Sequence, residues 1–346
     1  MIPASIDDVT ADWLADVTGF DVEEAEVEQI GVGIGVSSAL YRVHLRGPAC
    51  PGSVIVKLPA LDAAAVFTST MLRMYVREVR FFTELSSRSP VRVPAGWHAA
   101  VDEETSRFVV VMEDMGQMRT VDQVEGMSVT DAARAVDELA AWHATWWRQA
   151  DELAGAGVTV SLGDPVYPAV LPLVFGEGWE KVTAELDVPA PILEVGPRFA
   201  AAIPRLLTDL CRAPTTVIHG DFRADNILFA PDASVVLLDF QLIGTGSGAY
   251  DLAYFVTQSV TVDVAAEHER ALFERWTAGL RAGGVPAEDL GRMWEDYRTA
   301  ALFCLVYPVV ASRGMDLTDP RQRGLLECMN ERFARAVEQL DLAELL

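Results

Sequence analysis

Two short apolar segments, joined by a polar stretch of fixed length, constrain the fold of this chain more than any other feature. Residues 217–218 form the first segment and residues 235–238 the second. Asp221 and Asn226 lie in the polar stretch between them, and Asp239 follows the second segment directly. Short apolar runs bounded by polar loops are typical of buried strands. We therefore expect two strands that hold these three side chains near one point.

This set of side chains suits the transfer of a phosphoryl group. The reaction needs a carboxylate that accepts the proton of an attacking hydroxyl. It also needs hard oxygen ligands for the Mg²⁺ that bridges the phosphates. Asp221, Asn226 and Asp239 offer oxygen atoms of both kinds.

Length and composition predict a two-lobed protein with a large interior. The chain has 346 residues, of which 51% are hydrophobic, and this length exceeds that of a usual single core. No apolar run approaches the roughly 18 residues that a membrane helix needs. The first ten residues contain two acids and no base, so no secretory signal is expected.

Charge and cysteine usage exclude several classes of partner. The formal net charge of −24 would repel nucleic acid and anionic membranes at long range, so neither is an expected partner. The four cysteines lie far apart without the spacing of a zinc site or a disulfide framework. They are expected to be reduced thiols of a cytoplasmic protein. The sequence gives no indication of oligomeric state.

Periodicity divides the chain into a sheet-rich part and a helical part. Apolar residues at helical spacing predict helices, and alternation predicts strands. From residue 130 onward the pattern is mainly helical. The first part is expected to contain an acidic helical lead at 5–28, a glycine-rich loop at 31–38, strands at 40–45, 53–57, 91–101 and 107–112, and one helix at 69–86.

The polar stretch resembles a known family motif. His219, Gly220, Asp221 and Asn226, followed by Asp239, match the His-Gly-Asp-x-x-x-x-Asn motif and metal-binding Asp of the aminoglycoside phosphotransferase family. The resemblance is strongest to its choline-kinase-like and ecdysteroid-kinase-like branches. It implies the protein-kinase-like fold, with Asp221 as the catalytic base and Asn226 and Asp239 as Mg²⁺ ligands.

Further residues match the same family upstream, in the expected order. Lys57 ends the third strand, where the family's lysine contacts the nucleotide phosphates, and Glu78 on the next helix is its expected ion-pair partner. Residues 112–116 resemble the hinge, so the backbone of Glu113 and Met115 is expected to bind adenine. The implied nucleotide is ATP, with GTP as an alternative.

The glycine-rich loop departs from the protein-kinase pattern. Gly33 and Gly35 match the first two glycines, whereas Ser38 occupies the place of the third. Ser37 and Ser38 are therefore expected to add hydroxyl donors to the phosphate site.

The segment after Asp239 is too short to dock a peptide. Only about a dozen residues separate Asp239 from Asp251, and Gly220 stands where protein kinases often have an arginine. A small-molecule hydroxyl acceptor is therefore expected. Asp251 could begin a helix as its N-cap, and the resemblance suggests that it also steadies the catalytic loop, beneath which His219 is expected to pack.

The sequence as a whole predicts an α+β, bilobal, protein-kinase-like fold. The nucleotide-binding lobe is expected at 1–115, and the helical lobe, with catalytic loop 217–229 and the acceptor site, at 116–346. The acceptor is expected to be a neutral or partly apolar alcohol, because no dense acidic cluster marks the helical lobe. Two alternatives stay open: an aminoglycoside phosphotransferase, and a non-catalytic nucleotide-binding module of the same fold.

Overall fold

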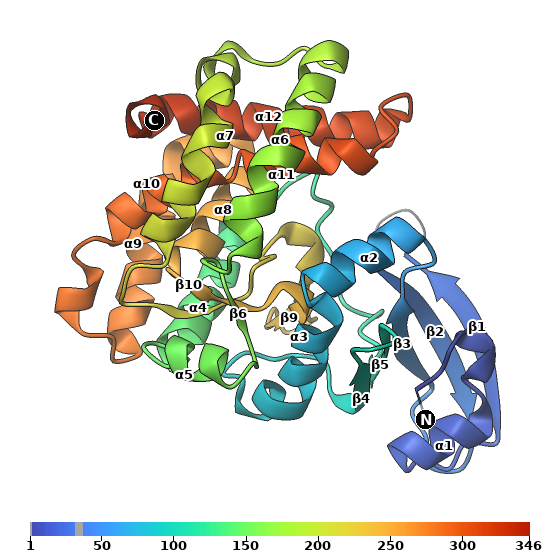
Figure 1. Ribbon diagram of the computed structural model, residues 1–346. Helices are drawn as coiled ribbons and strands as arrows, with labels where there is room; N and C mark the ends of the chain where they lie inside the picture. Colours follow the sequence, from blue (N-terminus) through green and yellow to red (C-terminus); the bar gives the residue numbers. More distant parts are fainter. Residues whose placement is uncertain (1, 32–36) are drawn as a thin grey trace. The chain divides into compact units, whose positions relative to one another are not determined.

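The computed structural model describes residues 2–31 and 37–346 (Figure 1). The chain forms two compact units. The first contains the chain up to Met118 together with Val236–Leu242, and the second contains Arg119–Val235 and Ile243–Leu346. The antiparallel sheet of the first unit and the mainly helical second unit confirm the predicted α+β class.

The first unit is built on a five-stranded antiparallel sheet with the order β1-β2-β3-β5-β4. Its central strand β3 is buried along most of its length, from Val54 to Leu58. The strands are β1 (Glu24–Ile30), β2 (Ser38–Arg46), β3 (Ser53–Pro59), β4 (Gly96–Asp102) and β5 (Arg107–Glu113).

The predicted helical lead at 5–28 is wrong over its last residues. Helix α1 (Ala11–Thr18) ends at Gly19, which has φ 74°, and Glu24–Ile30 forms the edge strand β1. The acids of β1 face bases of β2, since Glu24 lies opposite Arg46 and Glu28 opposite Arg42. Opposite charges across a strand pair stabilise the pairing, which a reading of the acidic segment alone does not reveal.

The predicted helix at 69–86 is divided in two. Helix α2 (Ala63–Met71) is separated from α3 (Met74–Arg80) by Arg73, which has φ 55°. A π-helical turn, Phe81–Leu85, continues α3. The Tyr75 ring of α3 stacks on Phe108 of β5 with ring centroids 4.2 Å apart, so α3 is fixed against the sheet.

A short segment from the second half of the sequence belongs to the first unit. The Leu237 N–H donates to the Arg92 carbonyl at 3.0 Å. Phe240 stacks on Phe81 with ring centroids 3.5 Å apart and ring planes 9° from parallel. These contacts fix residues 236–242, and with them Asp239, beside the end of α3.

The second unit is mainly helical, as predicted (Figure 1). Its short strands form a three-stranded sheet in the order β6-β10-β7. The strands of this sheet are β6 (Val160–Ser161), β10 (Gly244–Gly246) and β7 (Thr216–Ile218). Two further short strands are β8 (Ile227–Phe229) and β9 (Val235–Leu237), and the residues of β9 are divided between the two units. The helices are α4 (Val129–Thr145), α5 (Ala150–Gly155), α6 (Val166–Glu185), α7 (Ala190–Leu210), α8 (Ala249–Ser259), α9 (Val262–Ala282), α10 (Met293–Phe303), α11 (Val306–Ala311) and α12 (Pro320–Gln339).

Helix α4 fixes β7 and therefore the start of the catalytic loop. One face of this helix is buried, including Val136, Leu139 and Trp142. Trp142 Nε1 donates to the Val217 carbonyl of β7 at 2.9 Å. A buried indole N–H needs such an acceptor, so this bond both satisfies Trp142 and places β7.

A buried arginine joins α12 to two other segments. Arg332 is 2% exposed, and its guanidinium donates to the carbonyls of Gln123 and Gln258 at 2.6 Å each and to that of Val124 at 3.1 Å. Burial lowers the pKa of Arg332 from its ordinary value. One side chain thus donates to three backbone carbonyls; those of Gln258 and Val124 also accept longer bonds, from Gln123 Nε2 at 3.4 Å and Cys328 Sγ at 3.5 Å.

Within the described residues, no helix has both the length and the apolar character needed to cross a membrane.

Replacing Arg332 with methionine should lower the free energy of unfolding by about 3 kcal/mol, because three backbone carbonyls lose a donor. Urea denaturation with an unchanged m-value measures this loss. Arg321→Met on the same helix is the control, since Arg321 is 69% exposed in its ion pair with Asp122 and exposed pairs contribute little. Equal stability of the two variants would contradict the prediction.

Candidate active site

A buried carboxylate holds the start of the catalytic loop in the second unit. After β7 the chain turns at Gly220, which has φ 83°. The N–H groups of His219 and Gly220 donate to Asp251 at 2.6 and 2.9 Å. Asp251 lies in the first turn of α8, whose N-cap is Gly248 and not Asp251, and it is fully buried. It holds the loop, as the family resemblance implies. Glycine adopts this positive φ without strain.

A histidine from α4 completes this support. His143 Nε2 lies 3.0 Å from Asp251 Oδ2, and Trp276 Nε1 donates to His143 Nδ1 at 3.0 Å. Because Nδ1 accepts a hydrogen bond, the proton of the neutral ring is on Nε2, which donates to Asp251. The pairing of His143 with Asp251 was not predicted from the sequence.

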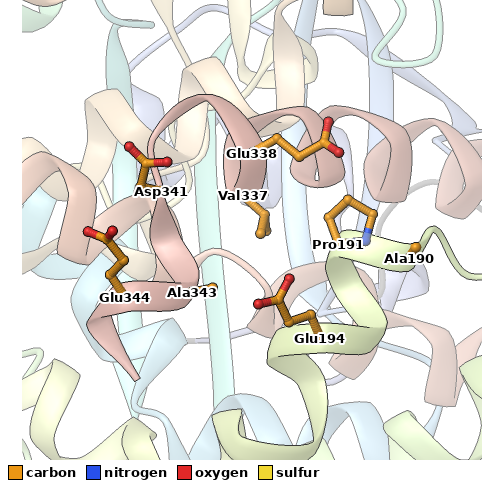
Figure 2. Close-up of a pocket in the computed structure, with 8 residues that line it drawn as sticks. All are labelled: Ala190, Pro191, Glu194, Val337, Glu338, Asp341, Ala343 and Glu344. Carbon is orange, nitrogen blue, oxygen red and sulfur yellow. The ribbon is translucent and has the colours of Figure 1, made fainter.

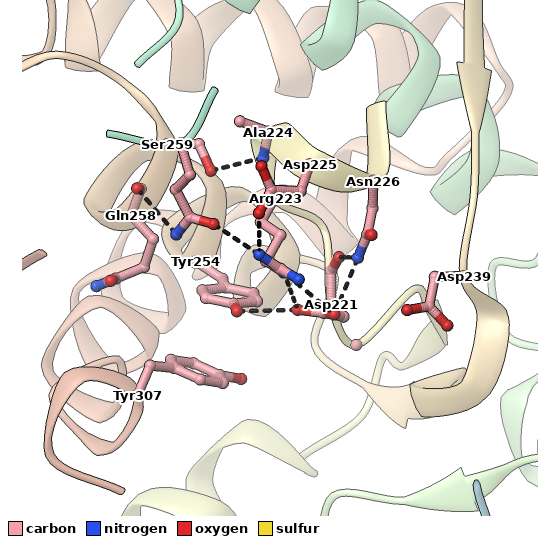
Figure 3. A network of polar contacts seen from close by, with 12 residues as sticks. Asp221, Arg223, Ala224, Asp225, Asn226, Asp239, Tyr254, Gln258, Ser259 and Tyr307 are labelled. Atoms are coloured by element: carbon pink, nitrogen blue, oxygen red, sulfur yellow. Dashed lines mark hydrogen bonds and ion pairs between the residues drawn. The ribbon is translucent and has the colours of Figure 1, made fainter. Parts of the chain in front are cut away.

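The Asp221 carboxylate is held by three side chains of the second unit (Figure 3). Oδ1 accepts a 2.9 Å bond from the Tyr254 hydroxyl, and Oδ2 accepts a 2.9 Å bond from Asn226 Nδ2. Arg223 Nε lies 3.3 Å from Oδ1 and 3.4 Å from Oδ2. Asp221 itself is 8% exposed. A carboxylate bonded at both oxygens has a defined orientation, which general-base chemistry requires.

Arg223 is itself anchored within the second unit. It contacts Asp225, and its NH1 donates to Gln123 Oε1 at 2.8 Å. Gln123 is buried in the loop that Arg332 also contacts. Sequence reasoning missed Arg223, Gln123 and Tyr254. For Arg223 the sequence did contain a signal, because this basic residue lies two positions after Asp221 of the motif.

The expected phosphate-binding lysine lies in an ion-pair cluster of the first unit. Lys57 Nζ is 2.8 Å from Glu78 Oε1 and 2.8 Å from Asp239 Oδ1. Lys57 is 5% exposed and Glu78 is 1% exposed. Burial alone would lower the pKa of Lys57, but the carboxylates of Asp239 and Glu78 outweigh it and raise this pKa above its ordinary value. The ammonium is therefore charged throughout the physiological pH range.

Gln241 links Asp239 to the end of the glycine-rich loop. Asp239 has φ 64°, a left-handed conformation that aspartate tolerates better than most residues. Gln241 Nε2 donates to Asp239 Oδ2 at 3.2 Å, and Ser37 Oγ donates to Gln241 Oε1 at 2.6 Å. Gln241 stands where protein kinases have glycine, and here its side chain positions a carboxylate.

The two serines of the glycine-rich loop differ in their bonding. The Ser37 hydroxyl is engaged with Gln241, whereas Ser38 Oγ is buried and has no hydrogen-bond partner among the described residues. An unsatisfied buried hydroxyl fits a role as donor to a ligand. Gly33 and Gly35 lie outside the described residues.

Some backbone groups of the expected hinge form hydrogen bonds within the protein. The Glu113 N–H donates to the Ala95 carbonyl at 2.9 Å, and the Met115 carbonyl accepts from the Met118 N–H at 2.9 Å. The Glu113 N–H and the Met115 carbonyl are thus already engaged, and adenine binding at this turn stays a prediction. Between them, Asp114 is bonded to Arg42 and Ser53, which fixes this turn.

A family model, described as the phosphotransferase enzyme family, matches residues 28–288. The chain belongs to this family. Membership confirms the predicted class of enzyme, a phosphotransferase, and the family resemblance on which it rested. The ecdysteroid-kinase-like branch stays a prediction. No curated protein sequence matches the chain.

Solved structures of the protein-kinase-like fold resemble this phosphotransferase over most of its length. Aminoglycoside 2′-phosphotransferase-IIIa in complex with GDP has 16% identity and a TM-score of 0.58, with 96% of this chain and 99% of that chain covered. Choline kinase from Cryptosporidium parvum Iowa II has 11% identity and a TM-score of 0.56, with 92% and 89% covered. Amicoumacin kinase in complex with AMP-PNP, Ca²⁺ and its ligand has 10% identity and a TM-score of 0.55, with 96% and 93% covered. At these identities the likeness confirms the fold.

The oxygen atoms of the expected metal ligands fit a hard cation. Asn226 makes its two bonds to Asp221 through Nδ2, which leaves the carbonyl oxygen Oδ1 for a metal, whereas the Asp239 carboxylate contacts Lys57 and Gln241. Within the described part of the chain, no group of three or more His, Cys, Asp or Glu is arranged to hold a metal ion by itself.

A pocket of about 380 Å³ in the second unit lies outside this constellation (Figure 2). Ala190, Pro191 and Glu194 of α7 face the C-terminal end of the chain across it. Four of its lining residues are acidic, and none belongs to the catalytic loop. It is therefore not the site that Asp221 serves. The remaining lining residues are Val337, Glu338, Asp341, Ala343 and Glu344.

Replacing Asp251 with alanine should free the amides of His219 and Gly220 and cost about 3 kcal/mol of stability, since two buried donors lose a charged acceptor. Hydrogen exchange at these two amides should become faster than in the wild type. Asp263→Ala, at the exposed start of α9, serves as the control. Unchanged protection of both amides would show that Asp251 does not hold the loop.

Proposed function

We propose that this phosphotransferase moves the γ-phosphate of ATP onto a hydroxyl group of a small molecule, with Asp221 as the base. The observation that carries the proposal is the bonding of the Asp221 carboxylate at both oxygens, in a loop held by Asp251. A base must be aimed at the hydroxyl before it can accept the proton.

In the proposed reaction the acceptor hydroxyl gives its proton to Asp221 as its oxygen bonds to the γ-phosphorus. The bond from that phosphorus to the bridging oxygen of the diphosphate breaks, and ADP leaves. Lys57, with its charge maintained by Glu78, holds the phosphates, and Ser38 is a further donor. Asn226 and Asp239 would bind Mg²⁺, which supplies positive charge that stabilises the charge developing on the phosphates.

The surroundings of Asp221 favour a neutral or partly apolar alcohol as acceptor. The Tyr254 ring stacks on Tyr307 at 3.9 Å between centroids. Burial raises the pKa of both phenols well above its ordinary value, and the Asp221 carboxylate raises both further. A polycationic acceptor such as an aminoglycoside would need several carboxylates, and this aromatic pair supplies none.

Asp221→Asn should lower the turnover number by at least about 10²-fold, because the amide cannot accept the proton. The dissociation constant for MgATP should stay as in the wild type, since Asp221 acts on the acceptor. ADP release and calorimetric titration measure the two quantities. Asp232→Asn, in the exposed turn before β9, is the matched control. A fully active Asp221→Asn enzyme would refute the assignment.

A screen of neutral alcohols, amino alcohols, sterols and aminoglycosides tests the acceptor, with acceptor-dependent ADP or GDP release as the measurement. We expect the largest increase with a neutral, partly apolar alcohol and ATP. An increase with aminoglycosides alone would favour an antibiotic-modifying enzyme. Nucleotide binding without release of diphosphate under any condition would favour the non-catalytic module.

A further inference from the structure

The Tyr254 hydroxyl bonds the oxygen of Asp221 that no amide holds. Asn226 bonds Oδ2, and Tyr254 bonds Oδ1 at 2.9 Å. Arg223 Nε lies at nearly equal distances from both oxygens, so it contributes positive charge but does not fix the rotation of the carboxylate. Rotation of the carboxylate about its last torsion would therefore break the Tyr254 and Asn226 bonds together.

Tyr254 is held in this position by burial and by ring packing. It lies on α8, the helix that also carries Asp251, and it is 4% exposed. Its ring stacks on Tyr307 of α11 with ring planes 14° from parallel, and the Tyr307 hydroxyl contacts that of Tyr250. Figure 3 shows the Tyr254 hydroxyl directed at Asp221, with the Tyr307 ring beside it.

The phenol is also a permanent donor. Burial above all, together with the Asp221 carboxylate, raises the pKa of Tyr254 well above its ordinary value. The hydroxyl therefore keeps its proton and can only donate when it bonds a carboxylate. Hydrogen bonds to charged groups are stronger than those between neutral groups.

We infer that Tyr254 is a positioning residue for the reaction: it fixes the rotation of the Asp221 carboxylate so that the remaining lone pair of Oδ1 is aimed at the acceptor hydroxyl. Helix α8 then positions both the backbone and the side chain of Asp221. Asp251 holds the backbone of the loop, and Tyr254 holds the side chain. This inference rests on the proposed role of Asp221.

Tyr254→Phe tests the inference, because it keeps the ring and its stack and removes only the hydroxyl. The probe is MgATP with water as the acceptor, and the measurement is the steady-state release of ADP. We expect the turnover number to fall at least about tenfold, the effect of losing a hydrogen bond to a charged group on the reacting residue. The Michaelis constant for MgATP should stay within about twofold of the wild type, since the nucleotide contacts are unchanged.

Tyr297→Phe is the matched control. Tyr297 is also a buried tyrosine whose hydroxyl donates to a carboxylate, that of Glu269, at 2.7 Å. Both variants should lose similar stability in thermal unfolding, but only Tyr254→Phe should lose turnover. Equal turnover of Tyr254→Phe and wild type would overturn the inference, and so would a crystal structure of Tyr254→Phe with the Asp221 carboxylate unrotated.

Asp221→Asn, measured in the same assay, distinguishes a failure of the proposed role of Tyr254 from a failure of the proposed function. Loss of ADP release in Asp221→Asn with full activity in Tyr254→Phe would overturn the role of Tyr254 and leave the proposed function intact. Full activity in Asp221→Asn would overturn the proposed function itself.

Discussion

The geometry of the catalytic loop depends on one buried carboxylate. Asp251 accepts two backbone N–H groups and a histidine side chain, and in each bond a donor approaches a charge that has no access to water. Such bonds are strong because the alternative is an unsolvated charge. The segment from β7 to Asp221 is therefore held by α8, which is more than thirty residues away in sequence.

The sequence could predict those parts of the site that a local pattern encodes. The spacing of Asp221, Asn226 and Asp239 was visible, and the family resemblance pointed to Lys57 and to Glu78 as its partner, although β3 continues past Lys57 to Pro59. Arg332 and Tyr254 were not, because an arginine or an aromatic residue on a helix has the same pattern whether it packs, bonds a carbonyl or bonds a carboxylate. Their roles depend on contacts between segments far apart in sequence.

The fold could be predicted in class but not in every element. Strand β1 escaped prediction because its acidic composition does not reveal its antiparallel pairing with β2, and Arg73 divides a helix whose apolar spacing looks continuous. In the first case the deciding information lay in the partner strand, and in the second it lay in one backbone angle. Tertiary contacts override local preference at such places.

The return of residues 236–242 to the first unit has a consequence for dissecting this protein. Any fragment that stops near Met118 lacks Asp239, so Lys57 would keep Glu78 but lose its second carboxylate, together with the aromatic stack that Phe240 adds to Phe81. The fragment that begins at Arg119 would carry those seven residues without the sheet that they contact. No single cut of the chain therefore separates two complete units, because the first unit consists of two segments that are far apart in sequence.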